Sequence, residues 1–181
     1  MKTLVIHPDD VSTEFLKEIY RDKGYTVETR WNAPMSTIRK LVRTHDRIMF
    51  MGHGGPSGLF GYTMHLNNPH FVKLLKKKET VCIWCNADKY VESVGLVGFY
   101  TGMFISEVGE ASYFGIKKTQ KEIDYSNNLF VQNFREVMDS PNILTEIKER
   151  YSGECEVIKY NNARLYYTKT PIVKSSEILV I

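Results

Sequence analysis

The sequence predicts an α/β fold, a mostly parallel sheet with helices on both faces, organised as a single domain over residues 1–181. Two observations lead to this prediction. Short apolar segments typical of buried strands alternate with segments whose apolar residues recur at helical spacing, which favours a parallel sheet. The 181 residues, 43% of them hydrophobic and 25% charged, suffice for one sizeable core. Neither a repeat nor a linker divides the chain.

The first half of the chain gives the order strand, helix, strand, helix, strand, loop, helix, strand. Asp10 or Ser12 can cap the first helix, which Gly24 would end, and Ser36 can cap the second. The segment 52–67 is rich in glycine and polar residues, which is typical of a functional loop. We expect strands at 2–7, 25–30, 47–51 and 80–84, a small hairpin at 59–65 and a third helix at 69–77.

The second half is expected to be mostly helical and to end in a C-terminal β-hairpin. Asn161 and Asn162 form a plausible turn between two short segments that would pair, 156–160 and 164–168. Before the hairpin we expect a strand at 103–105 and helices at 106–113, 126–138 and 141–153, and after it an edge strand at 177–181.

Composition excludes several classes of function. A net charge of +3 is too small to indicate a nucleic-acid partner. The apolar start is too short for a signal peptide, and no run is long enough for a membrane helix, so we expect a cytoplasmic protein. Three cysteines, an odd number, argue against a disulfide framework. The glycines match no phosphate-binding fingerprint, and we expect no cofactor.

Two apolar runs each end in a residue with catalytic potential. His53 follows the run 47–51, and Cys85 follows the run 80–84, 32 residues later. Because neighbouring parallel strands place their carboxyl ends side by side, both residues can face one cleft. A cysteine thiolate is a strong nucleophile, and a histidine can take up its proton. Gly54, which lacks a Cβ, and the amide of Cys85 could supply the oxyanion donors.

The segments Met51-Gly52-His53-Gly54 and Cys82-Ile83-Trp84-Cys85-Asn86 resemble the caspase-like cysteine peptidases, the superfamily of caspases, legumain, gingipain, clostripain and separase. Those proteins carry one apolar strand ending in His-Gly and a later one ending in the nucleophilic cysteine. The resemblance implies a caspase-like three-layer sandwich, related to the flavodoxin-like one, with a His53–Cys85 dyad and Gly54 in the oxyanion hole. Trp84 stands where the family often has Ala or Asp.

Five further residues are candidates for substrate binding. Gly55 lies in the glycine-rich loop, and Asn86 and Asp88 follow the cysteine, where a helix could begin. Glu107 and Glu110 are three residues apart, so they would share a helix face and could bind a basic substrate side chain, or simply face solvent. The expected substrate is a peptide or small amide.

Two other functions remain open. The same fold and cleft could belong to a non-catalytic signalling or ligand-binding domain. Alternatively, His7-Pro8-Asp9-Asp10 resembles the motif of the LmbE-like zinc-dependent deacetylases, which implies His7 and Asp10 as metal ligands and Asp9 as the base. The family's following Glu is Val11 here. Cys82 and Cys85 are three apart on a strand, so they should face opposite sides of the sheet and not form a redox pair.

Overall fold

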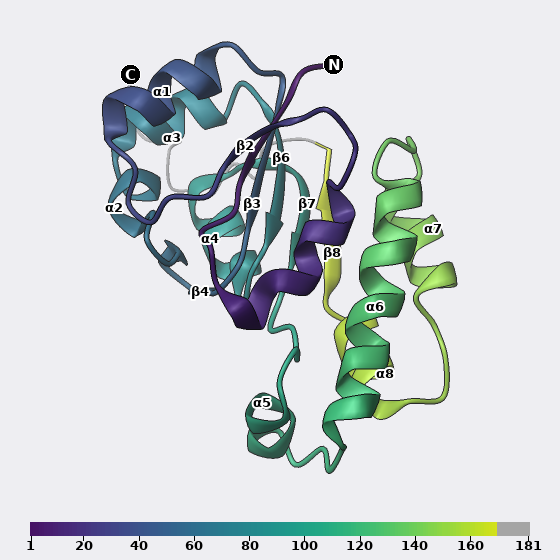
Figure 1. The fold of residues 1–181 in the computed structure, drawn as a ribbon. Coiled ribbons are helices and arrows are strands. Elements are labelled where there is room, and N and C mark those ends of the chain that lie inside the picture. The colour runs from purple at the N-terminus through teal and green to yellow at the C-terminus, as the bar shows by residue number, and fades with distance from the viewer. Residues whose placement is uncertain (170–181) are drawn as a thin grey trace, which may run out of the picture.

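A computed structural model describes residues 1–169 and confirms the predicted fold class. One sheet of six strands forms the middle layer, and helices cover both of its faces (Figure 1). The strands are β1 (Thr3–Ile6), β2 (Thr26–Glu28), β3 (Arg47–Met51), β6 (Glu79–Ile83), β7 (Val97–Thr101) and β8 (Leu165–Thr168).

The strand order is β2-β1-β3-β6-β7-β8, and the first five strands are parallel. Strand β2 lies on one side of β1, and the next strand in the chain, β3, lies on the other side. This gives a topological switch point between β1 and β3, the place where open α/β sheets bind ligands. Only β8 at the edge runs antiparallel to its neighbour.

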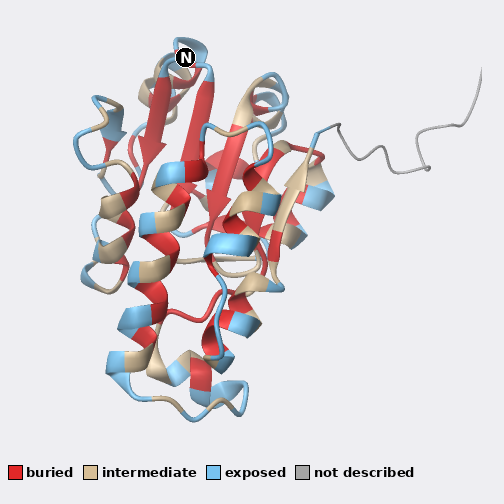
Figure 2. Cartoon of the chain, turned by 90° about the vertical axis from the view of Figure 1, so that its right-hand side faces the viewer, coloured by how far each residue is buried: buried red, intermediate tan, exposed pale blue. Residues whose placement is uncertain are grey.

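Alternate strand residues face opposite helical layers, as the two-residue period of a strand requires. Phe50 and Trp84 pack into the layer of α1 (Met35–Arg43), α3 (Pro69–Leu75) and α4 (Ala87–Val94). Met51 and Ile83 pack into the layer of η1 (Val11–Ile19), α6 (Gln120–Val137) and α7 (Ile143–Arg150). The four inner strands β1, β3, β6 and β7 are accordingly buried along most of their length (Figure 2). The helices are η1 (Val11–Ile19, a 3₁₀ helix), α1 (Met35–Arg43), α2 (Thr63–Leu66), α3 (Pro69–Leu75), α4 (Ala87–Val94), α5 (Val108–Tyr113), α6 (Gln120–Val137), α7 (Ile143–Arg150) and α8 (Glu156–Asn162).

The predicted C-terminal hairpin is wrong in its first strand. Residues 156–162 form helix α8, and β8 pairs antiparallel with β7 instead. The reason is the burial of Val157, Ile158 and Asn161, whose spacing follows a helix face and not a strand. Asn161, expected in a turn, is buried and exchanges two hydrogen bonds with the backbone of Ile105.

Two further elements lie elsewhere than expected. The fifth strand is β7, and the segment 103–105 is irregular. The sequence does not predict β7 because it contains Gly98, and a glycine usually weakens or interrupts a strand. Glycine is required at this position, since a Cβ would lie only 1.8 Å from the carbonyl oxygen of Thr80. The loop hairpin is formed by β4 (Gly54–Gly55) and β5 (Gly58–Leu59), not by 59–65.

Helix α6 begins six residues before the expected start. Thr119 and Glu122 form a capping box at the helix start. Because the first turn is polar, the spacing of apolar residues does not indicate where the helix begins. The edge strand expected at 177–181 lies outside the described residues. Within residues 1–169, every helix is too short or too polar to cross a membrane.

Candidate active site

The carboxyl ends of β1, β3 and β6 meet at one edge of the sheet. Asp10 and Ser12 follow β1, His53 follows β3, and Cys85 follows β6. The edge therefore includes the topological switch point and gathers residues from three separate parts of the sequence. Figure 1 shows η1, α5 and α6 around this edge.

His53 is held by a chain of two short hydrogen bonds. Its Nε2 atom lies 2.6 Å from the hydroxyl oxygen of Ser12, and that hydroxyl donates to Asp10 Oδ1 at 2.6 Å. Because the one hydroxyl proton goes to Asp10, Ser12 accepts the proton of His53 Nε2. The Nδ1 atom of His53 is then the basic nitrogen. The bonds from Ser12 also lower the pKa of Asp10.

Sequence reasoning missed this Asp10–Ser12–His53 chain. The sequence pattern predicts Asp10 and Ser12 as helix caps, and Asp10 alternatively as a metal ligand. Asp10 does cap η1 by accepting from the backbone N–H of Ser12 at 2.9 Å. The available clue was their position directly after β1, since the strands on either side of a switch point bring their following loops together.

Cys85 is partly buried, and its thiol is protonated in this structure's environment. The single thiol proton has two acceptors within reach of the Sγ atom, the carbonyl oxygen of Phe104 at 3.3 Å and Glu110 Oε1 at 3.4 Å. Burial and, after it, the negative charge of Glu110 together raise the pKa of Cys85 to about 12. This environment favours the neutral thiol over the thiolate near neutral pH.

His53 and Cys85 line one small cavity of about 20 Å³, together with Phe15, Phe104 and Ser106. Among residues 1–169 no hydrogen bond joins His53 to Cys85. The cavity has room for about one water molecule. The shared lining agrees with the predicted common cleft.

Trp84 also lines this cavity, although its side chain packs in the core of the opposite helical layer. Its ring packs with Tyr90, and its Nε1 atom donates to the carbonyl of Gly55 at 3.1 Å. A Cβ on Gly54 would lie 2.3 Å from Trp84 Cδ1. This contact accounts for the glycine at position 54 by packing, and its role as an oxyanion donor stays a prediction. Gly55 serves here as an anchor for the indole.

The other predicted binding residues divide into two groups. Asn86 adopts a left-handed backbone conformation before α4 and donates to Met103 Sδ, and Asp88 lies 3.7 Å from Lys89. Neither lines the cavity at the sheet edge. Glu107 lines the adjoining groove, while Glu110 bonds Cys85 and accepts from the backbone of Ser106.

A larger groove of about 580 Å³ opens beside the small cavity, and Phe15 and Ser106 line both. Its lining contains the carboxylates of Glu107 and Asp124 and, among the residues described, neither lysine nor arginine. Asn127, 5% exposed, also lines it, and its Oδ1 atom has no hydrogen-bond partner in this part of the chain. The groove therefore offers acceptors and negative charge to a ligand.

The histidine of the His-Pro-Asp-Asp motif is held by contacts within the fold. His7 is 1% exposed, and its two ring nitrogens bond the hydroxyls of Tyr20 at 3.0 Å and Thr13 at 3.1 Å. Burial lowers the pKa of His7 to about 4, so the ring is neutral. Asp9 pairs with Lys17. With both nitrogens of His7 engaged, the arrangement does not suit a metal ligand, and no cluster of metal-binding side chains occurs within residues 1–169.

Cys82 is fully buried in the layer opposite Cys85, as the strand period predicts, and burial raises the pKa of its thiol. The two cysteines therefore do not form a redox pair. Compared with models of protein families and with curated proteins, the sequence gives no match.

Proposed function

We propose that the protein is a cysteine-dependent hydrolase of the caspase-like type, acting on a peptide or a related amide. The observation that carries the proposal is the common cavity of His53 and Cys85 at the carboxyl edge of the sheet. A second observation supports it: Ser12 engages His53 Nε2, which directs the basic Nδ1 atom to proton transfer.

The chemistry begins with a neutral pair. A substrate that enters the cavity displaces water, and the thiol proton of Cys85 passes to His53 Nδ1 as sulfur attacks the carbonyl carbon. Asp10, acting through Ser12, stabilises the imidazolium that forms. The imidazolium then protonates the leaving amine, and the C–N bond breaks. Water, deprotonated by His53, hydrolyses the resulting thioester and restores the thiol.

The groove indicates the kind of substrate. Glu107 and Asp124 supply negative charge, and Asn127 in the same lining has a buried Oδ1 atom without a hydrogen-bond partner in the described chain. Such a lining favours a substrate with a cationic side chain, because a lysine or arginine brings donors and opposite charge together. Lysyl and arginyl amides are therefore the first substrates to test.

A non-catalytic binding domain is the second candidate. It is favoured by the bond from Cys85 to Glu110 and by the raised pKa of the thiol, since both oppose the thiolate that attack requires. On this alternative the groove binds a cationic segment without cleaving it.

Hydrolysis of a library of fluorogenic peptide amides distinguishes the two functions. The proposal predicts turnover of basic substrates by the wild-type protein and its loss in Cys85→Ala. Cys155→Ala is the matched control, because Cys155 is also a partly buried free thiol but lies at the start of α8. Turnover that persists in Cys85→Ala, or binding of basic peptides with no turnover at all, would overturn the hydrolase proposal.

A further inference from the structure

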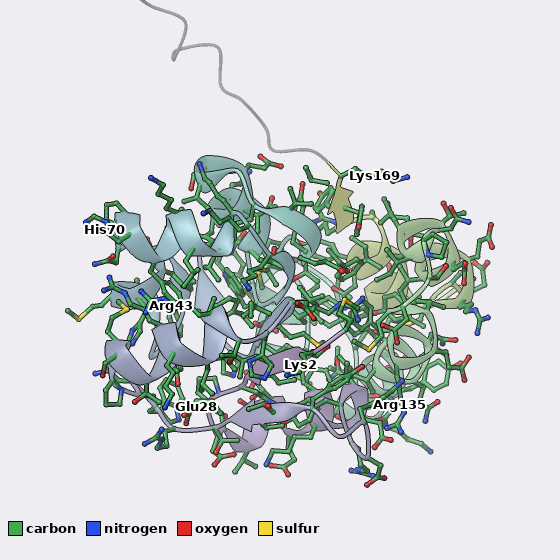
Figure 3. All side chains as sticks on the ribbon, turned by 90° about the horizontal axis from the view of Figure 1, so that it is seen from above. Lys2, Glu28, Arg43, His70, Arg135 and Lys169 are labelled. Atoms are coloured by element: carbon green, nitrogen blue, oxygen red, sulfur yellow. The ribbon has the colours of Figure 1, made fainter. Side chains whose placement is uncertain are left out.

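A second groove, of about 370 Å³, lies on the outer surface of α1 and α3, and none of its lining residues lines the cavities at the sheet edge. Its lining is almost entirely basic and includes no aspartate or glutamate among residues 1–169. The residues are Arg39, Arg43, His70, Lys73, Leu74 and Lys77. Figure 3 shows Arg43 and His70 on the same flank of the molecule.

The positive charge of this groove is local. Four arginine and lysine side chains line it, whereas the whole chain has a net charge of only +3. None of these four takes part in an ion pair within the described part of the chain. Arg39 and Arg43 are four residues apart on α1, a spacing at which like charges repel and destabilise the helix. A bound anion would remove that repulsion.

One of the cations is already fixed in position. Arg39 Nη2 donates to Asn68 Oδ1 at 3.0 Å, and the same oxygen accepts from two backbone amides at the start of α3. The guanidinium is thereby fixed between the two helices with other N–H groups still available. The N–H groups of an arginine guanidinium can donate two parallel hydrogen bonds to the oxygens of one phosphate group, and lysine ammonium groups contribute further positive charge.

We propose that this groove binds a small anion carrying two or more phosphate groups. One phosphate carries about −1.5 to −2 charges at pH 7, so four cations match at least two such groups. The volume is that of a small-molecule pocket and not of an extended surface for a macromolecule. The proposal is independent of the hydrolase function, since the lining shares no residue with either cavity at the sheet edge.

Calorimetric titration with sodium tripolyphosphate tests the proposal, with inorganic phosphate as a second probe and duplex DNA as a third. The test variant is Arg43→Ala with Lys77→Ala, since neither side chain makes a hydrogen bond within residues 1–169 and the fold should be kept. The control is Lys117→Ala with Lys121→Ala, two exposed lysines outside the groove. Urea unfolding verifies that both variants are folded.

We expect tripolyphosphate to bind wild type and control more tightly than inorganic phosphate, and the test variant to lose about tenfold or more in affinity. Arg43→Lys with Lys77→Arg should restore binding. Equal affinity in wild type and test variant would overturn the proposal. So would tight binding of duplex DNA without binding of tripolyphosphate, which would assign the charge to nucleic acid.

Discussion

His53 Nε2 lies 2.6 Å from the hydroxyl oxygen of Ser12, which in turn donates to Asp10 at 2.6 Å. The serine thus connects a carboxylate to the imidazole, and Asp10 itself need not approach the ring. This connection joins the loop after β1 to the loop after β3 across the topological switch point, and it leaves the Nδ1 atom of His53 as the nitrogen that Ser12 does not engage.

Removal of the Ser12 hydroxyl should release the ring. In Ser12→Ala we expect His53 to change from one tautomer, protonated at Nε2, to a mixture of both, because the bond that selects the tautomer is gone. Long-range ¹H–¹⁵N correlation spectra report the tautomer directly. Ser12→Thr keeps a hydroxyl and serves as the control. An unchanged spectrum in Ser12→Ala would contradict the proposed hydrogen-bond chain.

Alkylation of Cys85 should be slow in the free protein and should accelerate only as the pH rises toward about 12, where the thiol ionises. Glu110→Gln removes a negative charge beside the sulfur, so the pKa of Cys85 should fall. We expect alkylation at pH 8 to be roughly three- to tenfold faster in this variant. Mass spectrometry of iodoacetamide-treated protein gives the rate at each cysteine.

The control for that experiment is Glu92→Gln, an exposed carboxylate on α4, which should leave the rate at Cys85 unchanged. Faster alkylation in the control as well, or rapid labelling of Cys85 in the wild type at pH 7, would refute the proposed environment of the thiol.

The buried ring of His7 should make stability depend on pH. Its pKa falls from 6.5 in the unfolded chain to about 4 in the folded protein, so the unfolded state binds a proton first on acidification. The resulting stability is present above pH 6.5 and is lost as the pH falls through 4, by roughly 3 kcal/mol in total. Urea unfolding at pH 7, 5.5 and 4.5 measures this loss.

His7→Gln should lose less stability than wild type over the same pH interval, because the titrating group is absent. His70→Gln, which changes an exposed histidine, should behave as wild type. Equal pH dependence in wild type and His7→Gln would show that His7 is not the group responsible.

Gly54→Ala should destabilise the fold, since the new Cβ would meet Trp84 Cδ1 at 2.3 Å and the carbonyl oxygen of Gly58 at 2.9 Å. Overpacking of this kind costs about 1–3 kcal/mol in the free energy of unfolding. Gly109→Ala is the control: it lies in α5 with no atom within 4 Å of its Cβ, so stability should be kept or slightly increased. A Gly54→Ala protein as stable as wild type would rule out the proposed indole contact.

The parts of the fold that follow from apolar pattern were predictable. Strand β3 matches the predicted 47–51, and β6 differs from 80–84 by one residue at each end, because both are continuous apolar runs. Strand β7 was not predictable, because Gly98 resembles a turn signal in the sequence. The glycine is required there by its close contact with the neighbouring strand β6, which the sequence does not reveal. The buried polar role of Asn161 likewise depends on the distant backbone of Ile105.

The candidate site was predictable in position and less so in detail. His53 and Cys85 share a cavity because parallel strands align their carboxyl ends, a rule that needs no coordinates. The partners of these residues, Ser12 for His53 and Glu110 for Cys85, come from separate segments of the chain. Their pairing depends on how η1 and α5 pack over the sheet edge, which local sequence does not specify.

The central claim is that Cys85 attacks a substrate carbonyl with His53 as its proton acceptor. Its most direct test is treatment of the protein with a lysyl or arginyl acyloxymethyl ketone, a carbonyl electrophile that alkylates an attacking cysteine, followed by peptide mapping. We predict one adduct, on Cys85, formed in wild type and in Cys155→Ala and strongly reduced in His53→Ala. An adduct at another cysteine, or equally fast modification of Cys85 in His53→Ala, would contradict the claim.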